Sequence, residues 1–532
     1  MKFERVVQVS REVGQTRSRT RKSELVAAAL REAAGLDDAG STDVAPTHVA
    51  PTDAAHPDDA RLVASYLSGE LPQRRTGIGW RSLTSLPPPA TASVRTVREI
   101  DGALTAIAAL RGPGSAARRT AAVTELFAAL NADEQRYLAD LLTGQVRQGA
   151  LDGVLLAAIA KAAQLPEAVV RRAVMLAGNP SEVVGVALAD GAAGLAAIGL
   201  AVGRPLRPML AGSAPDVPAA MAQVGAGQPV ALERKLDGIR LQVHKSGTEV
   251  RLYTRSLEEI TARLPEVVHL VSTLPARTLV ADAEAIALRP DGRPEPFQVT
   301  GARTASRGDP AELAAKVPVT TYLFDLLHLD GADLLDEPAA ARIEALAGLL
   351  PPGSLIPRMV TADPQQGAAF FAEQVAAGHE GVVVKSLQAP YAAGRRGAGW
   401  VKVKPRHTLD LVVLAVEWGS GRRRGTLSNI HLGAADPDSP TGFTMLGKTF
   451  KGMTDEMLAW QTERFLALET GRDGHIVHVR PEQVVEIAFD GLQRSSRYPG
   501  GLALRFARVL RYRDDKQADQ ADALTTVRSL AQ

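Results

Sequence analysis

A lysine in the stretch ERKLDGIR, residues 233–240, is the clearest candidate for chemistry in this sequence. Lys235 follows Arg234, precedes Leu-Asp-Gly, and is followed by a second arginine at Arg240. Nearby cations lower the pKa of an amine and so favour its neutral, nucleophilic form. An Asp-Gly turn beside a strand is also ordinary, as are surface lysines. The rest of the chain therefore decides whether Lys235 is a reactive amine or a solvated charge.

The groups that a lysine would need to attack a nucleotide phosphate follow it in a consistent order. Such an attack needs cations and a divalent metal near the phosphates, an aromatic face for the base and acceptors for the ribose. Later motifs supply them in the order Arg255, Glu284, Phe324, Glu380, Lys385, Lys402, Lys404, Arg508, Arg511, Arg513 and Lys516. Each has an ordinary alternative when taken singly.

Among these alternatives, Phe324 in the apolar run YLFDLL could be a core residue. Lys402 and Lys404 could be the wet face of an edge strand. The basic stretch GSGRRRG, residues 419–425, could be a solvated loop. The ordered set as a whole favours the nucleotide-binding interpretation.

The elements that must position these residues fall into three regions. The first, residues 1–202, has apolar residues at helical spacing and predicts helices, with Ser23 as a cap, over 22–35, 116–131, 132–144, 152–164 and 166–178. Within it, residues 37–60 are poor in large apolar residues and predict a flexible loop.

Beyond this helical region the residue pattern becomes that of strands. Between 203 and 407 strands alternate with helices, as in an α/β or α+β domain, and the clearest strand candidates are 249–256, 278–288, 319–329 and 380–387. From 408 to 532 short strands broken by turns predict a small β-barrel.

The order and spacing of the motifs resemble those of ATP-dependent DNA ligases, within the covalent nucleotidyltransferase superfamily that includes RNA ligases and mRNA capping enzymes. The motifs span residues 233–516, and six of them stand in the family's order. One departs from it: the last motif usually reads Arg-Phe-Pro-Arg, and here Ala507 replaces the proline. That change weakens the pre-setting of the backbone at one turn but leaves the charges.

The resemblance implies a role for each matching residue. Lys235 would form the phosphoamide with AMP. The nucleotide would be bound by Glu233 at adenine, Arg240 and Arg255 at the ribose and DNA phosphate, Glu284 at the ribose, Phe324 stacked on adenine, and Lys402 and Lys404 at the α-phosphate. Arg511, Asp515 and Lys516 would orient pyrophosphate. Glu284 and Glu380 would support a metal ion.

The resemblance also implies a multidomain fold. An all-α DNA-binding domain would span 1–202, an α/β (ATP-grasp-like) nucleotidyltransferase core 203–407, and a C-terminal β-barrel of the OB-fold type 408–532. The helical region resembles, more weakly, the DNA-binding domain of larger ATP-dependent DNA ligases. Its Arg147 would meet duplex phosphates from an interhelical turn, and Arg422 and Arg423 are further DNA-binding candidates.

We therefore expect an enzyme that uses ATP and Mg²⁺ to seal nicks in duplex DNA, through a lysyl-AMP and a 5′-adenylated DNA intermediate. The three domains would encircle the nicked duplex. Two alternatives stay open. One is an RNA ligase or mRNA guanylyltransferase with the same lysine chemistry, and the other is a catalytically dead nucleic-acid-binding protein.

Composition limits these options. The 61 lysines and arginines nearly balance 59 aspartates and glutamates, so nucleic-acid binding must rest on local patches. The chain has no cysteine, which excludes disulfides and the cysteine zinc module of NAD-dependent bacterial ligases and so favours ATP. We expect no secretory signal, because the first residues contain no long apolar run, and no membrane span, because no apolar run approaches ~18 residues. We expect a cytoplasmic, nucleoid-associated monomer without a membrane partner.

Overall fold

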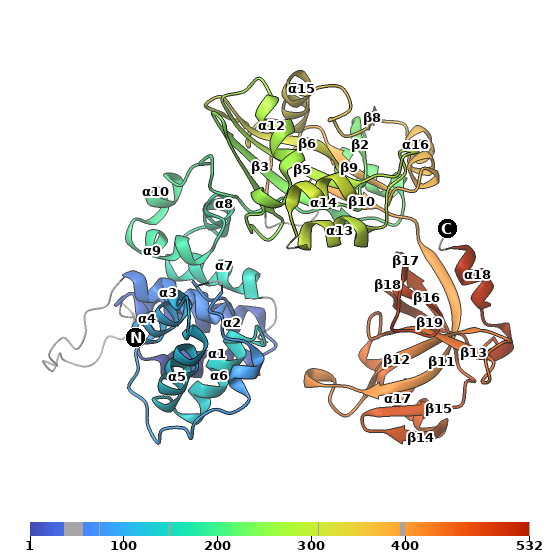
Figure 1. Cartoon of the computed structure of the whole chain (residues 1–532), viewed down its shortest axis with the longest axis horizontal. Coiled ribbons are helices and arrows are strands. Elements are labelled where there is room, and N and C mark those ends of the chain that lie inside the picture. Colours follow the sequence, from blue (N-terminus) through green and yellow to red (C-terminus); the bar gives the residue numbers. More distant parts are fainter. Residues whose placement is uncertain are drawn as a thin grey trace, which may run out of the picture.

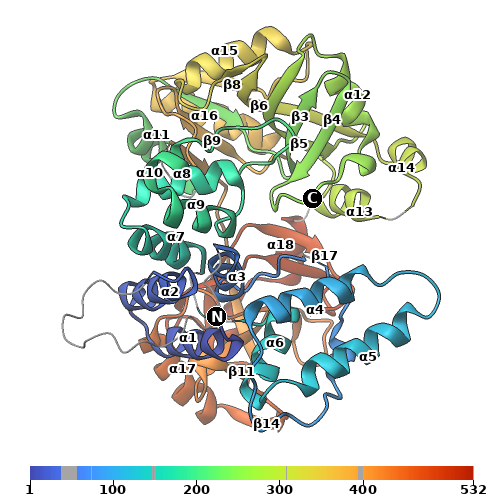
Figure 2. The same cartoon turned by 90° about the vertical axis from the view of Figure 1, so that its left-hand side faces the viewer.

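The computed structural model describes residues 1–36, 57–73, 75–146, 148, 151–306, 308–393 and 399–530. Three modules follow one another along the chain (Figure 1). The helical module precedes residue 200, the core module extends to residue 403, and the C-terminal module starts at residue 407. Figures 1 and 2 show the helical and C-terminal modules on the same side of the core. No helix among these residues is long and apolar enough to cross a membrane.

The helical module is built from helices of moderate length. They are α1 (Phe3–Gln15), α2 (Arg19–Ala33), α3 (Pro57–Leu67), the short 3₁₀ helix η1 (Trp80–Leu83), α4 (Val97–Ala109), α5 (Ser115–Ala128), α6 (Ala132–Leu142), α7 (Leu151–Ala162), α8 (Glu167–Ala177), α9 (Ser181–Ala189) and α10 (Gly191–Ala196). Asn131 and Glu134 form a capping box at the start of α6. Such a pair satisfies N–H groups that a bare helix end leaves free.

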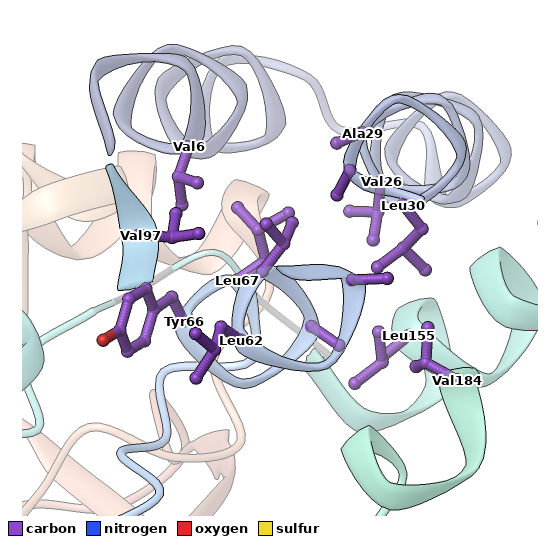
Figure 3. Close-up of a cluster of buried hydrophobic side chains, with 14 of the residues drawn as sticks. Val6, Val26, Ala29, Leu30, Leu62, Tyr66, Leu67, Val97, Leu155 and Val184 are labelled. Atoms are coloured by element: carbon purple, nitrogen blue, oxygen red, sulfur yellow. The ribbon is translucent and has the colours of Figure 1, made fainter. Parts of the chain in front are cut away.

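These helices share one apolar core (Figure 3). Val6 of α1, Leu30 of α2 and Leu67 of α3 are buried there together with Leu155 of α7 and Val184 of α9. The helical spacing of apolar residues in the sequence marks this buried face, because residues three and four apart lie on one side of a helix.

One helix start differs from the prediction. The first residue of α2 is Arg19, because the Ser18 side chain accepts a hydrogen bond from the Arg21 N–H. The predicted cap, Ser23, is wrong: it is buried within the helix, and its hydroxyl donates to the Thr20 carbonyl at 2.8 Å.

The predicted loop over 37–60 is shorter at its end. Residues 57–60 form the first turn of α3, where a proline and two acidic residues suit a helix N-terminus. Residues 37–56 lie outside the described residues, and so does the DNA-binding candidate Arg147.

The core module contains two five-stranded sheets, with strand orders β1-β10-β9-β2-β8 and β4-β3-β5-β6-β7. The strands are β1 (Gly212–Ser213), β2 (Val230–Arg234), β3 (Ile239–Ser246), β4 (Glu249–Thr254), β5 (Thr278–Ala287), β6 (Val319–Leu329), β7 (Ala332–Asp333), β8 (Arg358–Thr361), β9 (Val382–Ser386) and β10 (Trp400–Val403). The helices are α11 (Val217–Gly225), η2 (Thr261–Arg263), α12 (Pro265–Thr273), α13 (Phe297–Ala305), α14 (Pro310–Lys316), α15 (Ala339–Leu349) and α16 (Pro364–Ala376).

The mixture of helices and strands in the core is as predicted, but the α/β label is wrong in its strict sense. Among the described residues, the strand pairs of both sheets are antiparallel apart from β1 with β10. The short connection between β3 and β4 allows only antiparallel pairing, because parallel neighbours need a long crossover. The core is therefore an α+β module, the second of the two descriptions that the sequence left open.

The C-terminal module contains a seven-stranded sheet and a separate two-stranded hairpin. Its strands are β11 (His407–Trp418), β12 (Leu427–Ala435), β13 (Phe443–Thr449), β14 (Glu469–Asp473), β15 (Ile476–Val479), β16 (Val484–Phe489), β17 (Gly491–Arg494), β18 (Leu502–Arg505) and β19 (Arg508–Tyr512), and its helices are η3 (Gly421–Arg423), α17 (Asp455–Ala467), η4 (Ala518–Gln520) and α18 (Leu524–Ser529). The long strand β11 pairs with β12, β15 and β16.

A buried histidine of β3, His244, hydrogen-bonds to the segment that connects the helical module to the core. His244 Nδ1 accepts the Gly203 N–H at 2.9 Å, so the ring is neutral with its proton on Nε2, which lies 3.0 Å from Gln242 Oε1. Gln242 in turn exchanges hydrogen bonds with the backbone of Leu206. Burial, aided by the positive charge of His328 and Arg251, lowers the pKa of His244 to about 4.

We expect this histidine to make the fold acid-sensitive. Its folded pKa lies below the unfolded value near 6.5, so its stabilising effect is complete above pH 6.5 and is lost as the pH falls towards 4. The loss should approach about 3 kcal/mol of unfolding free energy. The check is denaturant unfolding at pH 7.5 and pH 5.0. His244→Asn should reduce the difference in unfolding free energy between the two pH values, whereas exposed His475→Gln should leave that difference unchanged. If His244→Asn also leaves it unchanged, His244 is not the source of the acid sensitivity.

Candidate active site

A cleft of about 1260 Å³ opens between the two sheets of the core. Its lining comes from β2 and β3 with the turn between them, from β5, β6, β9 and β10, and from the end of β18 in the C-terminal module. The turn between β2 and β3 carries Lys235, whose side chain is 21% exposed.

Two glycines allow the backbone around Lys235 to pack closely. A Cβ on Gly238 would lie 2.4 Å from the Ala285 carbonyl oxygen, and its N–H donates to Glu284 Oε1 at 3.2 Å. Gly381 has φ +130°, and a Cβ there would lie 2.2 Å from the Val403 oxygen. The Lys235 N–H donates to the Gly381 carbonyl at 2.9 Å. The K-x-D-G turn is therefore fixed to the start of β9 by contacts that only glycine permits.

A cluster of lysines surrounds one carboxylate in the cleft. The Glu380 carboxylate forms ion pairs with Lys235 and with Lys404. Burial acts to raise the pKa of Glu380, but these two lysines hold it below its usual range. Burial and the charges of Lys404 and Lys235 lower the pKa of Lys402. Three amines thus concentrate positive charge at one end of the cleft.

A second carboxylate, Glu284 of β5, lies near this cluster. Burial raises the pKa of Glu284 to about 7, although the charges of Lys235 and Arg240 act to lower it. The negative charge of Glu380 also acts to raise it, so the two carboxylates are close enough to repel. A pair of acids with pKa values displaced in opposite directions is typical of a functional site.

Two aromatic rings form an apolar wall of the cleft. Phe324 and Trp400 pack edge to face with their centroids 6.0 Å apart. Lys385 Nζ lies 4.7 Å and 4.2 Å from the centres of these rings, and it pairs with Glu233 at 2.6 Å. Arg358 also donates to the Glu233 carboxylate. Glu233 thus pairs with two cations, one of which, Lys385, lies against the two rings.

The C-terminal module reaches the cleft through its hairpin. Arg505, the last residue of β18, donates to Asp237 of the K-x-D-G turn at 2.6 Å. Lys404 donates to Asp490 at 3.2 Å. These contacts bring Arg505 and the following Phe506 to the rim of the cleft.

Comparisons with known proteins agree on one family. Residues 81–160 match the family model "DNA ligase N terminus", residues 208–404 match "ATP dependent DNA ligase domain", and residues 423–516 match "ATP dependent DNA ligase C terminal region". A relative from Kineococcus radiotolerans, named "Probable DNA ligase", is 57% identical over 529 residues, which cover 99% of each chain. The chain belongs to the ATP-dependent DNA ligase family.

Further similarities are consistent with this membership. A "Probable DNA ligase" from a Nocardioides species is 61% identical over 472 residues, covering 89% of this chain and 91% of that protein. The solved structure "Pmar-Lig_PreS3" covers 96% of this chain and 99% of its own with a TM-score of 0.61 and 16% identity, which supports the multidomain fold. The relatives identify the chain as a ligase, and they do not favour the RNA-ligase, capping-enzyme and inactive-binder alternatives.

The cleft of this ligase brings together most of the residues singled out in the sequence. Its lining includes Lys235 and the predicted neighbours Glu233, Arg240, Arg255, Glu284, Phe324, Glu380, Lys385, Lys402 and Lys404. Arg511 and Lys516 do not line it: Arg511 pairs with Glu486, and Lys516 pairs with Asp410, both at 2.7 Å. Arg423 lies in η3 and donates to the Phe450 carbonyl. Arg422 lies in the same turn, but its side chain is outside the described part.

Several residues in or next to the cleft were given no role from the sequence. Trp400 directly precedes the V-K-V-K motif, so its position in an expected strand could have suggested it. Arg358 and Asp237 gain their partners only through long-range pairing, with Glu233 and Arg505. Tyr391 lies in an irregular segment without a periodic pattern.

A magnesium site fits the two carboxylates of the cleft only in part. Within the described ranges, no three His, Cys, Asp or Glu side chains converge as a ready-made metal site. Mg²⁺ commonly uses one or two carboxylates together with water and substrate phosphates. Glu284 and Glu380 therefore suit a metal ion that arrives with the triphosphate, and Glu380 would have to release a lysine to reach it.

Proposed function

We propose that this ligase seals nicks in duplex DNA, with Lys235 as the residue that carries AMP. The observation that supports this most is the position of Lys235 in the cleft, beside Glu380 and within the field of Lys402 and Lys404. A phosphate brought there would meet concentrated positive charge, which stabilises the charge that develops during phosphoryl transfer. The apolar wall of Phe324 and Trp400 would receive the adenine.

The proposed reaction has three steps. First, Lys235 loses a proton and its neutral amine attacks the α-phosphate of ATP; an N–P bond forms, the bond to pyrophosphate breaks, and the nitrogen releases a second proton to solvent. Next, an oxygen of the 5′-phosphate at the nick attacks the same phosphorus, which frees Lys235 and leaves AMP on the DNA. Finally, the 3′-hydroxyl attacks the 5′-phosphate, loses its proton, and releases AMP as the phosphodiester forms.

The remaining groups would bind and orient. Lys404 and Lys402 would hold the α-phosphate, and Glu284 would accept a hydrogen bond from the ribose. Bound Mg²⁺, held by Glu284 and Glu380, would offset phosphate charge. The attraction between these charges and the phosphates is stronger where bulk water is excluded. Arg505 and Phe506, at the rim of the cleft, would help to exclude it.

The other two modules would bind the duplex. We infer that the helical module is the DNA-binding domain and that the C-terminal sheet is an OB-fold barrel, with Arg147, Arg422 and Arg423 near phosphates. Binding to phosphates should weaken steeply as salt rises, because counterions are released. We further propose that the enzyme works as a monomer in the cytoplasm, associated with the nucleoid.

The test is incubation of the protein with Mg²⁺ and ATP or GTP labelled at the α-phosphate, followed by denaturing electrophoresis. An adenylate that is stable to base and labile to acid supports the lysyl phosphoamide. Transfer of the label to the 5′ end of a nick, and then its release on sealing, supports the later steps. A guanylate alone, or no adduct at all, would overturn the proposal.

We expect Lys516→Ala to separate the steps. Lys516 lies outside the cleft, paired with Asp410, so it can reach pyrophosphate only if the C-terminal module reorients. The substitution should slow self-adenylation at least tenfold, as loss of a charged contact to a leaving group would. Sealing of a nick that already carries AMP should stay near normal, because no pyrophosphate leaves there.

Single-turnover rates of the two reactions provide the measurement. Arg480→Ala removes an exposed ion pair with Glu482 in the same module and should change neither rate. If both rates fall together in Lys516→Ala, the residue acts through folding or DNA binding. If neither falls, Lys516 is a surface charge.

A further inference from the structure

A series of buried contacts leads from the end of α8 in the helical module to Arg240 in the cleft. Its members are Met175 of α8, Tyr391 and Asp282, none of which lines the cleft. Every nucleotide-binding residue predicted from the sequence lies after residue 203, and the residues that line the cleft begin at Leu210. The groups that hold Arg240 nevertheless extend into the helical module.

The hydroxyl of Tyr391 fixes both groups that hold the Arg240 guanidinium. It donates to Asp282 Oδ2 at 2.7 Å and accepts the Met209 N–H at 2.9 Å. Arg240 Nη2 donates to the same Asp282 oxygen at 2.7 Å, and Nη1 donates to the Met209 carbonyl at 2.6 Å. Tyr391 is only 2% exposed, so loss of its hydroxyl would leave buried polar groups without this partner.

Arg240 in turn touches the apolar wall of the cleft. Its guanidinium carbon lies 5.5 Å from the ring centres of both Phe324 and Trp400. Tyr391 packs edge to face on Trp400 with centroids 6.0 Å apart. The position of Arg240 is therefore coupled to the surface that would receive the base, and Tyr391 supports both.

Met175 connects this support to the helical module. Its sulfur accepts the N–H of Ala393, two residues after Tyr391, at 3.2 Å. Its side chain packs in one apolar cluster with Tyr391 and Trp400. The end of α8 is closely seated: a Cβ on Gly178, which has φ +79°, would lie 2.7 Å from the Pro205 oxygen.

We propose that Tyr391 and Met175 are positioning residues for ATP. Through their contacts, the packing of the helical module against the core determines the position of Arg240. This assignment rests on the proposed binding of ATP in the cleft and extends it to a module that contributes no lining residue. Loss of either contact lets the guanidinium shift, which weakens ATP binding while leaving the attacking lysine in place.

The first test is Tyr391→Phe, which removes the hydroxyl and keeps the ring on Trp400. Equilibrium binding of ATP is measured in a Lys235→Ala background, where no covalent step can follow. The Kd should rise about tenfold, as expected for a lost hydrogen bond to a charged group. With Lys235 present, the ATP concentration for half-maximal self-adenylation should rise similarly, and the maximal rate should change little.

Tyr137→Phe is the matched control. Tyr137 is a buried tyrosine of the helical module whose hydroxyl donates to the Tyr66 carbonyl at 2.7 Å. Its loss should lower thermal stability without moving the Kd for ATP. An unchanged Kd in Tyr391→Phe, or a change confined to Tm in both variants, would overturn the positioning role.

The second test concerns Met175. Met175→Ala should raise the Kd for ATP, whereas Met175→Leu conserves the apolar volume and should stay near wild type. Arg171→Ala removes an ion pair within the same helix, with Glu167, and should leave the Kd unchanged. If Arg171→Ala weakens ATP binding as much as Met175→Ala does, the role assigned to Met175 is wrong.

Combining the two changes tests whether they act along one route. The effect of Met175→Ala with Tyr391→Phe should be smaller than the product of the single effects, because residues in one contact network are not additive. Strictly multiplicative effects would contradict the coupling. If the intact protein forms no adenylate but ATP binding still responds to Tyr391→Phe, the proposed function fails and this inference stands.

Discussion

Replacement of Lys235 by arginine should abolish formation of the covalent adenylate, with a loss on the order of 10⁶-fold, as when an enzyme loses its nucleophile. A guanidinium stays protonated and cannot attack phosphorus. The fold should persist, because the backbone at position 235 is held by the Gly381 carbonyl and an arginine can still pair with Glu380. Labelled ATP and denaturing electrophoresis measure the adduct.

Two comparisons sharpen this result. Lys316→Arg, at the exposed end of α14, should form adenylate at the normal rate. The Lys235→Arg protein should still seal a nick that carries AMP on its 5′-phosphate, because the last step needs no lysine nucleophile. A Lys235→Arg protein that still forms the adenylate would remove Lys235 from the reaction altogether.

Replacement of Arg342 by alanine should destabilise the core by roughly 3–5 kcal/mol of unfolding free energy. Arg342 of α15 is 1% exposed and makes a bidentate pair with Asp325 of β6, at 2.7 Å and 3.1 Å. It also donates to the Glu337 carbonyl at 2.6 Å. Removal of the cation leaves a buried carboxylate without its bidentate partner, in the residue that follows Phe324, a lining residue of the cleft.

The loss of unfolding free energy is measured by denaturant unfolding, with proteolysis of the core as the probe of unfolding. The double variant Arg342→Met with Asp325→Leu removes both charges and should recover much of the stability, because buried ion pairs are often no better than apolar pairs of similar size. Arg289→Ala, whose ion pair with Glu295 is exposed, should have little effect. A loss below about 1 kcal/mol in Arg342→Ala would show that water reaches Asp325.

The sequence alone predicted the residue set of the cleft because the motifs are local. Lys235 and Gly238 lie in one turn, and Lys402 and Lys404 are two positions apart at the end of β10, so alternation along an extended chain places both on one face. The core strands over 249–256, 278–288, 319–329 and 380–387 each contain an observed strand. Helical spacing likewise marked the buried face of the helical module.

Only the tertiary structure decided the partners of these residues. Arg240 donates to Asp282, which is 42 positions away in sequence, and Asp282 accepts from Tyr391, which is a further 109 positions away. The pairing of Arg505 with Asp237 joins positions 268 residues apart. Such contacts depend on how modules dock, and a periodic pattern reports only which face of its own element is buried.

The tertiary structure also separated motifs that the sequence places close together. Arg505 and Lys516 are eleven positions apart, yet Arg505 reaches the turn of Lys235 while Lys516 pairs with Asp410 outside the cleft. A turn at Phe506, with φ +56°, directs β19 away from the hairpin and into the seven-stranded sheet. The sequence determined which side chains could do the chemistry, whereas the path of the backbone between them decided which are in position, because the direction of a turn depends on the sheet it must join.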